Sequence, residues 1–211
     1  MSLHGTHLMD STYSSAEQSN YTLWIDGVGV FQLFLGSKFT VGGMQSGSGE
    51  THLSLLADLS DQHAHISRSG EGYLFESAGN AEVQGREAHR PVVLNDGYRI
   101  QLGRDVQLRF RQPTALSRSA CIDFESDHRP GRALDGIVLM AETVLLGPGN
   151  DCHIVCPEWE SSVMLVRKEG QLFCQSKLGL SIDGQLAPDG NKVQDGSVVT
   201  GPELRFRLEA A

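Results

Sequence analysis

The sequence predicts an all-β protein made of two tandem β-sandwiches. From Tyr21 onward, short runs of β-branched and aromatic residues are separated by glycines, which is typical of sandwiches and barrels. No segment keeps a helical period over any length. The second half of the chain also repeats parts of the first half in the same order. With 211 residues, the chain is long enough for two domains of about 100 residues each.

Strands are expected wherever apolar residues alternate or cluster between turn residues. Leu108 and Phe110, for example, alternate with Gln107 and Arg109, so this strand shows one face to a core. In the first half the expected strands are 21–26, 30–35, 38–42, 52–57, 64–68, 72–76, 82–83, 91–94, 98–102 and 106–111. In the second half they are 136–140, 143–146, 153–156, 162–167, 171–175, 180–182, 198–200 and 204–208.

Composition divides the chain into four parts. Residues 1–20 are polar and lack a period, which predicts a disordered lead or an expression remainder. Residues 21–113 form the first sandwich. Residues 114–134, rich in serine, arginine and acidic residues, are expected to be a linker. Residues 135–211 form the second, diverged sandwich.

The repeat rests on four matches at offsets of 96 to 99 residues. The tetrapeptide LRFR stands at 108–111 and again at 204–207. The other matches are 74–75 with 172–173, 83–85 with 182–184, and 96–97 with 195–196. Because four matches keep their order, duplication with loop changes explains them better than coincidence.

Charge and leader signals restrict the function classes. The net charge is −9, and neither half is basic: residues 21–113 hold 8 Lys/Arg against 10 Asp/Glu, and residues 135–211 hold 6 against 11. This argues against nucleic acid as a partner. No apolar run approaches the roughly 18 residues of a membrane helix, so no membrane partner is expected. Without a secretory leader pattern, we expect a cytoplasmic protein whose cysteines are buried free thiols.

One motif carries functional information. Ser60-Asp61-Gln62-His63, followed by Ile66, stands between two expected strands. Gly42-Gly43 precedes it, and 79–85 (GNAEVQG) and 94–103 (LNDGYRIQLG) follow it. In order and spacing, these segments resemble forkhead-associated (FHA) domains, the β-sandwiches that bind phosphothreonine. The resemblance covers about residues 21–113.

The resemblance implies a site whose chemistry has changed. In the family an arginine, a serine and a basic residue contact the phosphate, and an asparagine holds the peptide backbone. The matching positions here are Gly43, Ser60, Asp61 and Gly79, so only the serine is kept. Losing two cations, each worth roughly 1.5–3 kcal/mol per charge-assisted bond, and adding a carboxylate predicts that strong dianion binding is lost. The retained His63 is implied to support the loop.

Two functions follow from this site. The first is a non-catalytic scaffold that binds an unphosphorylated protein, with Gly43, Ser60, Asp61, Gly79 and Asn80 as candidate contact residues. The alternative is a phosphopeptide-binding module with a rearranged pocket around Ser60 and Asn80. There, charge would come from Arg68, Arg86 or Arg90, or from the amides of the 42–49 loop. By resemblance, the partner is a protein or phosphoprotein linked to a Ser/Thr kinase pathway.

The second half keeps almost none of the family's residues. Gly147-Pro148 stands where the family has Gly-Arg, 160–163 (ESSV) where it has Ser-x-x-His, and 178–180 (LGL) where it has Asn-Gly-Thr. No phosphate binding is expected there.

Other chemistry has weaker support. Cys152, His153 and Cys156, with Cys174, Cys121 or His128, would make a zinc site only if a second paired motif existed, and none does. His63 and His65 with His52 or His89 are an equally weak metal candidate. Ser60 and His63 lack any nucleophile-elbow context, so we expect no enzyme, no metal and no cofactor. Trp24 is expected in the core, and Trp159, between two glutamates, at an exposed contact.

Overall fold

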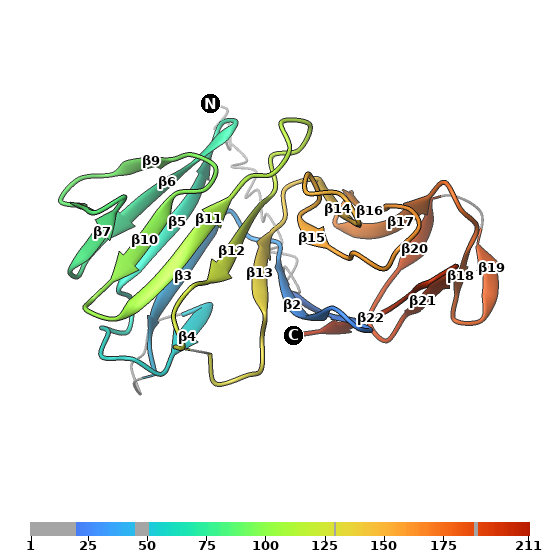
Figure 1. Ribbon diagram of the computed structural model, residues 1–211, viewed down its shortest axis with the longest axis horizontal. Helices are drawn as coiled ribbons and strands as arrows, with labels where there is room; N and C mark the ends of the chain where they lie inside the picture. Colours follow the sequence, from blue (N-terminus) through green and yellow to red (C-terminus); the bar gives the residue numbers. More distant parts are fainter. Residues whose placement is uncertain (1–19, 45–50, 129, 188–189) are drawn as a thin grey trace, which may run out of the picture.

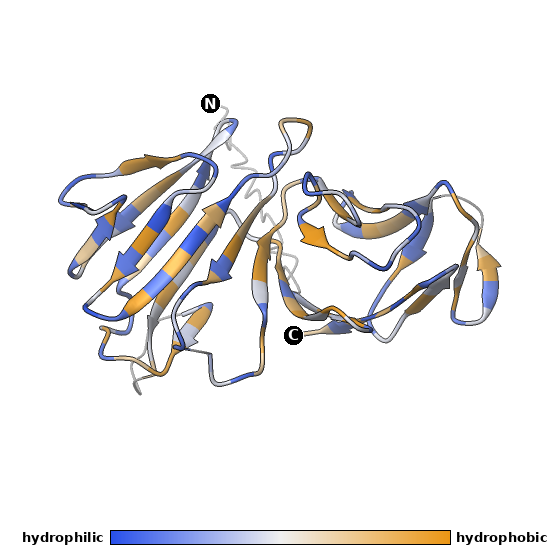
Figure 2. Ribbon diagram, viewed as in Figure 1, coloured by the Kyte–Doolittle hydropathy of each residue, from blue (hydrophilic) through white to orange (hydrophobic). Residues whose placement is uncertain are grey.

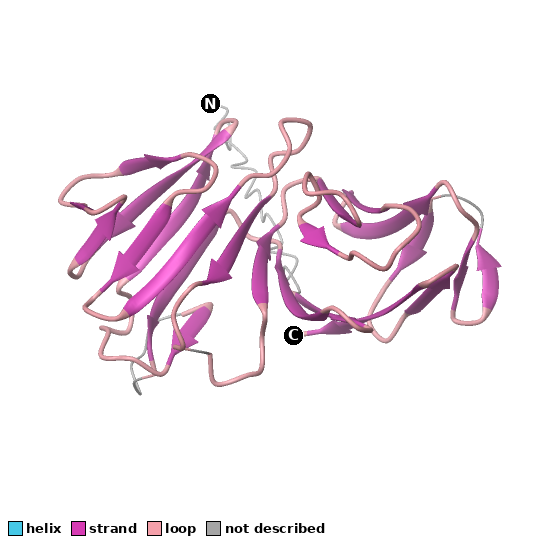
Figure 3. Ribbon diagram, viewed as in Figure 1, coloured by secondary structure: helices cyan, strands magenta, loops and turns pink. Residues whose placement is uncertain are grey.

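The part of the protein that the structure describes consists of strands and loops. The computed structural model describes residues 20–44, 51–128, 130–187 and 190–211, and these contain 22 strands. They contain no helix long and apolar enough to cross a membrane, and Figure 3 shows only strands and loops. The all-β prediction is therefore confirmed. Except for Asn20, the expected lead lies outside the described residues, as does most of the 42–49 loop.

Three sheets build two sandwiches that lie side by side (Figure 1). The first five-stranded sheet has the order β4 (Leu53–Leu55), β3 (Lys38–Gly43), β5 (Ala64–Ser69), β6 (Gly72–Ser77) and β9 (Val92–Leu94). The second has the order β15 (Ile154–Val155), β14 (Thr143–Gly147), β16 (Val163–Lys168), β17 (Gln171–Ser176) and β20 (Asn191–Val193).

A single sheet of twelve strands is shared by both sandwiches. One half of it has the order β19 (Gln185–Ala187), β18 (Leu180–Ile182), β21 (Val198–Gly201), β22 (Leu204–Ala210), β1 (Tyr21–Ile25) and β2 (Gly29–Phe34). It continues through β13 (Gly136–Leu139), β12 (Ala120–Phe124), β11 (Val106–Arg111), β10 (Arg99–Leu102), β7 (Ala81–Val83) and β8 (Arg86–Glu87). In β11, hydrophilic and hydrophobic residues alternate as predicted (Figure 2).

The two hydrophobic cores lie on opposite faces of this shared sheet. In β13, Ile137 and Leu139 belong to the first core, whereas Val138 belongs to the second. In the neighbouring β2, Leu33 packs into the second core and Phe34 into the first. Because successive side chains of a strand point to opposite faces, the central strands are buried on both sides.

The sandwiches exchange hairpins. The β1–β2 hairpin pairs with β22 through β1 and buries Leu23 and Leu33 in the second core, although the following β3 belongs to the first sandwich. The β12–β13 hairpin pairs with β11 and buries Ile122 and Ile137 in the first core, although β14 belongs to the second sandwich. The parallel pairing of β2 with β13 joins the two halves of the sheet.

This exchange corrects the expected division of the chain. The segment 114–134, expected to be a linker, contains β12, a strand of the first sandwich. The hairpin at 21–34, expected in the first sandwich, completes the second. Alternation along a strand indicates a buried face, but it does not indicate which partner covers that face. Strands β8, β19 and β20 were also not predicted, and each has only two or three residues.

The matched segments of the two halves adopt corresponding structures. Gln84-Gly85 and Asp183-Gly184 both form two-residue hairpin turns with positive φ at both positions. His52 Nδ1 accepts a hydrogen bond from the Thr40 amide (3.1 Å), and His153 Nδ1 accepts one from the Leu145 amide (3.0 Å).

The two tryptophans lie opposite to expectation. Trp159 is 4% exposed and stacks on Phe206 in the second core, with ring centroids 6.3 Å apart. Trp24 is 44% exposed, and its indole N–H donates to Glu209 (2.8 Å). Trp24 lies on the face of β1 opposite to Leu23 and Ile25, which fill the second core. The flanking glutamates of Trp159 therefore misled the prediction.

Candidate functional site

The candidate peptide-binding residues meet at one end of the first sandwich. Ser60 and Asp61 lie in the connection between β4 and β5, and Asn80 lies between β6 and β7. The backbone ties these connections together: the Gly43 amide donates to the Ser60 carbonyl (3.0 Å), and the Gly103 amide donates to the Asn80 carbonyl (2.8 Å). We call this region the loop end of the first sandwich.

His63 lies beneath the loop end and joins its connections. The side chain is buried, with 6% of the residue exposed. Its Nε2 lies 2.9 Å from the Asn80 carbonyl oxygen, and its Nδ1 lies 3.3 Å from the Ser60 amide and 3.2 Å from the Ser60 hydroxyl. Because a carbonyl only accepts, Nε2 carries the hydrogen and Nδ1 accepts from Ser60. All ring nitrogens are therefore occupied within the loop end.

The positions that match the family's arginine and asparagine have no room for a side chain. A Cβ added to Gly43 would fall on the Leu59 carbonyl oxygen, and one added to Gly79 would fall on the His63 ring. Gly42 is crowded in the same way by the Asp61 carbonyl. The close approach of these loops therefore requires glycine. Neither Gly43 nor Gly79 offers more than backbone groups to a ligand.

The remaining candidates differ in what they offer. Ser60 and Asn80 are exposed. The Asp61 carbonyl accepts a hydrogen bond from the Thr51 hydroxyl (2.7 Å), which holds this connection in place. The Asp61 carboxylate atom Oδ1 is buried and has no hydrogen-bond partner within the described part of the chain. A carboxylate therefore stands where the family has a cation.

Two grooves meet at Asn80, Gly103 and Arg104. One has a volume of about 450 Å³ and is lined by Asp58 and Asp105 among other residues. The other, of about 410 Å³, is lined by Glu82 and Glu87 among other residues. The full charged and ionisable lining is Asp58, His63, Glu82, Glu87, His89, Arg104, Asp105 and His128. The grooves are therefore predominantly acidic.

Arg104 is a groove residue that sequence reasoning missed. It follows Gly103 in the β10–β11 turn and borders both grooves. Among the described residues, its guanidinium has no hydrogen-bond or ion-pair partner; only its carbonyl accepts a bond, from Gln101 (3.0 Å). The pairing of the strands could have revealed it. Because β10 pairs antiparallel with β7, the turn between β10 and β11 lies at the same end of the sheet as the start of β7.

The arginines proposed as replacement cations lie elsewhere. Arg68 is at the far end of β5, about 16 Å along the strand from His63. Arg86 lies beyond the turn that ends β7, and neither it nor Arg90 borders the two grooves. The structure therefore does not bring Arg68, Arg86 or Arg90 to Ser60.

The corresponding end of the second sandwich has different chemistry. Ser162 replaces His63: the Ser77 hydroxyl donates to the His63 carbonyl (3.1 Å), and the Ser176 hydroxyl donates to the Ser162 carbonyl (3.3 Å). The Ser162 hydroxyl lies 3.9 Å from the Cys152 thiol. A small side chain next to a buried thiol thus occupies the position of the imidazole.

The cysteines are buried free thiols, as predicted. Burial raises the pKa of Cys121, Cys156 and Cys174 to about 12 in each case, so these thiols stay protonated. The Cys121 thiol donates to the His153 carbonyl (3.3 Å). Within the described ranges, no three or more His, Cys, Asp or Glu side chains are grouped as metal ligands.

Comparisons with known proteins give a likeness to solved structures and no match in sequence. No protein-family model matches the sequence, and no curated protein matches it. Among solved structures, the chain is similar to the N-terminal FHA domain from EssC, a component of the bacterial Type VII secretion apparatus. The identity is 13%, the alignment covers 90% of this chain and 92% of that chain, and the TM-score is 0.26.

Proposed function

We propose that this protein is a non-catalytic protein–protein interaction module whose first sandwich holds a partner segment across its loop end without recognising phosphothreonine. The observation that carries the proposal is the steric exclusion of side chains at positions 43 and 79. A phosphate at Ser60 would meet the Ser60 hydroxyl with Asp61 next to it, because the Ser60 amide already donates to His63 and the Gly43 amide to the Ser60 carbonyl. No paired guanidinium would neutralise its two negative charges.

The charge of the grooves defines the partner further. Asp58, Asp105 and Glu82 border the grooves and have no ion-pair partner in the described ranges, whereas Glu87 is paired with His89 (2.6 Å). Complementary charge favours a Lys- or Arg-containing, unphosphorylated segment. A cytoplasmic protein from a Ser/Thr kinase pathway is the partner that the family resemblance implies.

Matched peptide libraries test this function. Fluorescence anisotropy with a degenerate threonine library and its phosphothreonine counterpart should give equal or weaker binding for the phosphorylated library. Binding of basic peptides should weaken in the Asp58→Asn/Asp105→Asn double variant and with rising salt. Asp151→Asn, in the second sandwich, is the control for a general charge effect. Binding that requires the phosphate and is lost in Ser60→Ala or Arg104→Gln would refute the proposal.

A rearranged phosphopeptide pocket is the second candidate function, and Arg104 is the observation that favours it. Arg104 borders both grooves beside the exposed Asn80. In that case phosphate-dependent binding would be lost in Arg104→Gln and in Ser60→Ala. Ser60→Ala is a clean variant, because it removes the hydroxyl but keeps the amide that donates to His63.

A further inference from the structure

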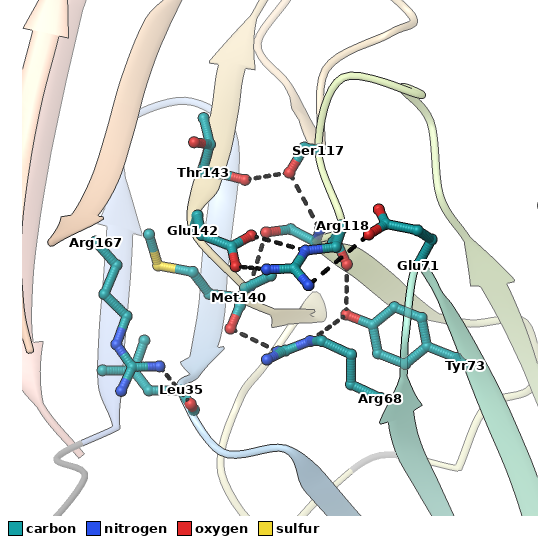
Figure 4. Close-up of polar contacts among 12 residues, drawn as sticks. Leu35, Arg68, Glu71, Tyr73, Ser117, Arg118, Met140, Glu142, Thr143 and Arg167 are labelled. Carbon is teal, nitrogen blue, oxygen red and sulfur yellow. Dashed lines mark hydrogen bonds and ion pairs between the residues drawn. The ribbon is translucent and has the colours of Figure 1, made fainter.

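Two arginines converge at the junction of the sandwiches, far from the loop end. Arg68, on β5 of the first sandwich, donates through Nη2 to the Met140 carbonyl (2.7 Å) and to the Gly36 carbonyl (3.4 Å). Arg167, on β16 of the second sandwich, donates through Nη1 to the Leu35 carbonyl (2.7 Å). Figure 4 shows both side chains directed towards this junction.

The two arginines occupy corresponding positions. The Arg68 amide donates to the Ser37 carbonyl (2.8 Å), and the Arg167 amide donates to the Glu142 carbonyl (2.7 Å). The carbonyls that accept from the two guanidiniums belong to Met140 and Leu35. These residues directly follow Leu139 and Phe34, which are paired in the parallel strands β13 and β2. Neighbouring strands are about 4.8 Å apart, so the exchange of hairpins places both guanidiniums at the same end of the central strands.

Neither guanidinium is neutralised by a carboxylate. Within the described part of the chain, Arg68 and Arg167 form no ion pair. The two glutamates labelled in Figure 4, Glu142 and Glu71, are paired with Arg118. Burial, and after it the positive charge of Arg68, lowers the pKa of Arg167. The two cations therefore act on each other without an intervening anion.

Both guanidiniums keep donors for a ligand. A guanidinium has five N–H groups. Arg68 uses Nη2, and its Nε approaches the Tyr73 hydroxyl (3.4 Å), while Arg167 uses only Nη1. Neither residue has a nitrogen that is both buried and without a partner, so the nitrogens that form no hydrogen bond, Arg68 Nη1 and Arg167 Nε and Nη2, are not fully enclosed by the protein. Gly36 also borders a groove of about 410 Å³ that contains Lys38 and no acidic residue.

We propose that Arg68 and Arg167 form a binding site for a tetrahedral oxyanion of the phosphate type, bridging the two sandwiches. Guanidinium groups match the geometry of such oxyanions through paired N–H donors. The anion would neutralise two charges that the protein leaves unmatched at this junction. The site uses no residue of the loop end, so it is independent of the proposed peptide function.

Calorimetric titration of the full chain with sodium phosphate, at constant ionic strength with chloride as the reference, tests this site. We expect saturable binding with one phosphate per chain. Arg68→Gln and Arg167→Gln should each weaken it by about tenfold to a hundredfold, as expected for loss of a charge-assisted contact. The matched control is Lys168→Gln, which removes one positive charge from an exposed neighbour and should change the affinity less than about twofold.

Thermal unfolding shows whether each variant is folded and gives a second measure of phosphate binding. Phosphate should raise the Tm of the wild type by mass action but not that of Arg167→Gln, and Arg167→Lys should keep part of the shift. A phosphothreonine peptide, titrated in parallel, distinguishes a free ion from a phosphoryl group carried by a partner. Loss of peptide binding in Arg167→Gln supports a partner-borne phosphate at this site.

Three outcomes would overturn the proposal. The first is the absence of saturable phosphate binding, which would leave the arginines as donors to strand-end carbonyls only. The second is an equal loss of affinity in Lys168→Gln, which would indicate unspecific attraction. The third is phosphopeptide binding that survives Arg167→Gln and disappears in Arg104→Gln, without any inorganic phosphate bound at the junction. That result would also refute the proposed function, whereas the first two leave it intact.

Discussion

The two sandwiches share a backbone scheme and differ in the chemistry of their loop ends. At the first, His63 bonds to two connections through both ring nitrogens. At the second, Ser162 stands in the place of His63 and lies beside the buried Cys152 thiol. The hydrogen bond to the backbone carbonyl of this position is kept, from Ser77 in the first sandwich and from Ser176 in the second. The backbone geometry of a loop end can thus be retained although the side chain at this position is replaced.

The largest expected effect concerns which segments belong to which sandwich. A fragment of residues 36–141 contains β3 to β13 and every buried residue of the first core except Phe34, whereas residues 21–113 lack the β12–β13 hairpin. We expect the first fragment to unfold cooperatively and the second to remain unfolded, because it exposes the core face that Ile122 and Ile137 cover. Circular dichroism and amide NMR spectra measure this. A folded 21–113 fragment would contradict the exchange of hairpins.

Leu33→Ala tests the same exchange with a single residue. Leu33 lies in the first fifth of the chain but is fully buried in the second core. We expect a loss of about 2–5 kcal/mol in the free energy of unfolding. Hydrogen exchange should increase more in β14 and β16 than in β5 and β6. Leu186→Ala, at a residue 83% exposed, is the control and should change stability by less than about 0.5 kcal/mol.

The comparison of loop ends predicts a difference between His63→Ala and Ser162→Ala. Removing His63 leaves the Ser60 amide without its acceptor, takes one of two donors from the Asn80 carbonyl and opens a space beneath Gly79, so we expect a loss of about 2–3 kcal/mol. Ser162→Ala should lose about 1 kcal/mol or less, because its hydroxyl has only a distant thiol contact. Urea unfolding measures both. Equal losses would show that the imidazole does not hold the loop end.

The smallest effect is a pH dependence that arises in the second sandwich. Burial lowers the pKa of His153 to about 4, and its Nε2 has no partner among the described residues. Below pH 6.5 the unfolded chain binds a proton that the folded chain does not, so stability falls as the pH decreases towards 4. We expect a loss of about 1–2 kcal/mol between pH 6.5 and pH 5. His153→Asn should remove this slope; an unchanged slope would assign it to other groups.

Much of the local structure was predictable. Most strands follow from alternation between turn residues, and the paired turns at Gln84-Gly85 and Asp183-Gly184 lie where the repeat placed them. At the loop end, the sequence proposed Gly43, Ser60, Asp61, Gly79 and Asn80 as candidate contact residues, and their binding role stays a prediction. It did not identify Arg104, because an isolated Gly-Arg-Asp turn resembles any other until the β10–β11 turn is placed beside Asn80.

Most strand positions, the turns and the lack of a cationic side chain at positions 43 and 61 were determined by the sequence alone, because they depend on neighbouring residues and on residue type. The tertiary structure decided which hairpin completes which sandwich. The apolar run at 137–141 indicated burial on both faces, but burial is non-directional and does not specify what covers each face. For the same reason only the fold could place Trp24 outside, Trp159 inside, and Arg68 and Arg167 at one junction.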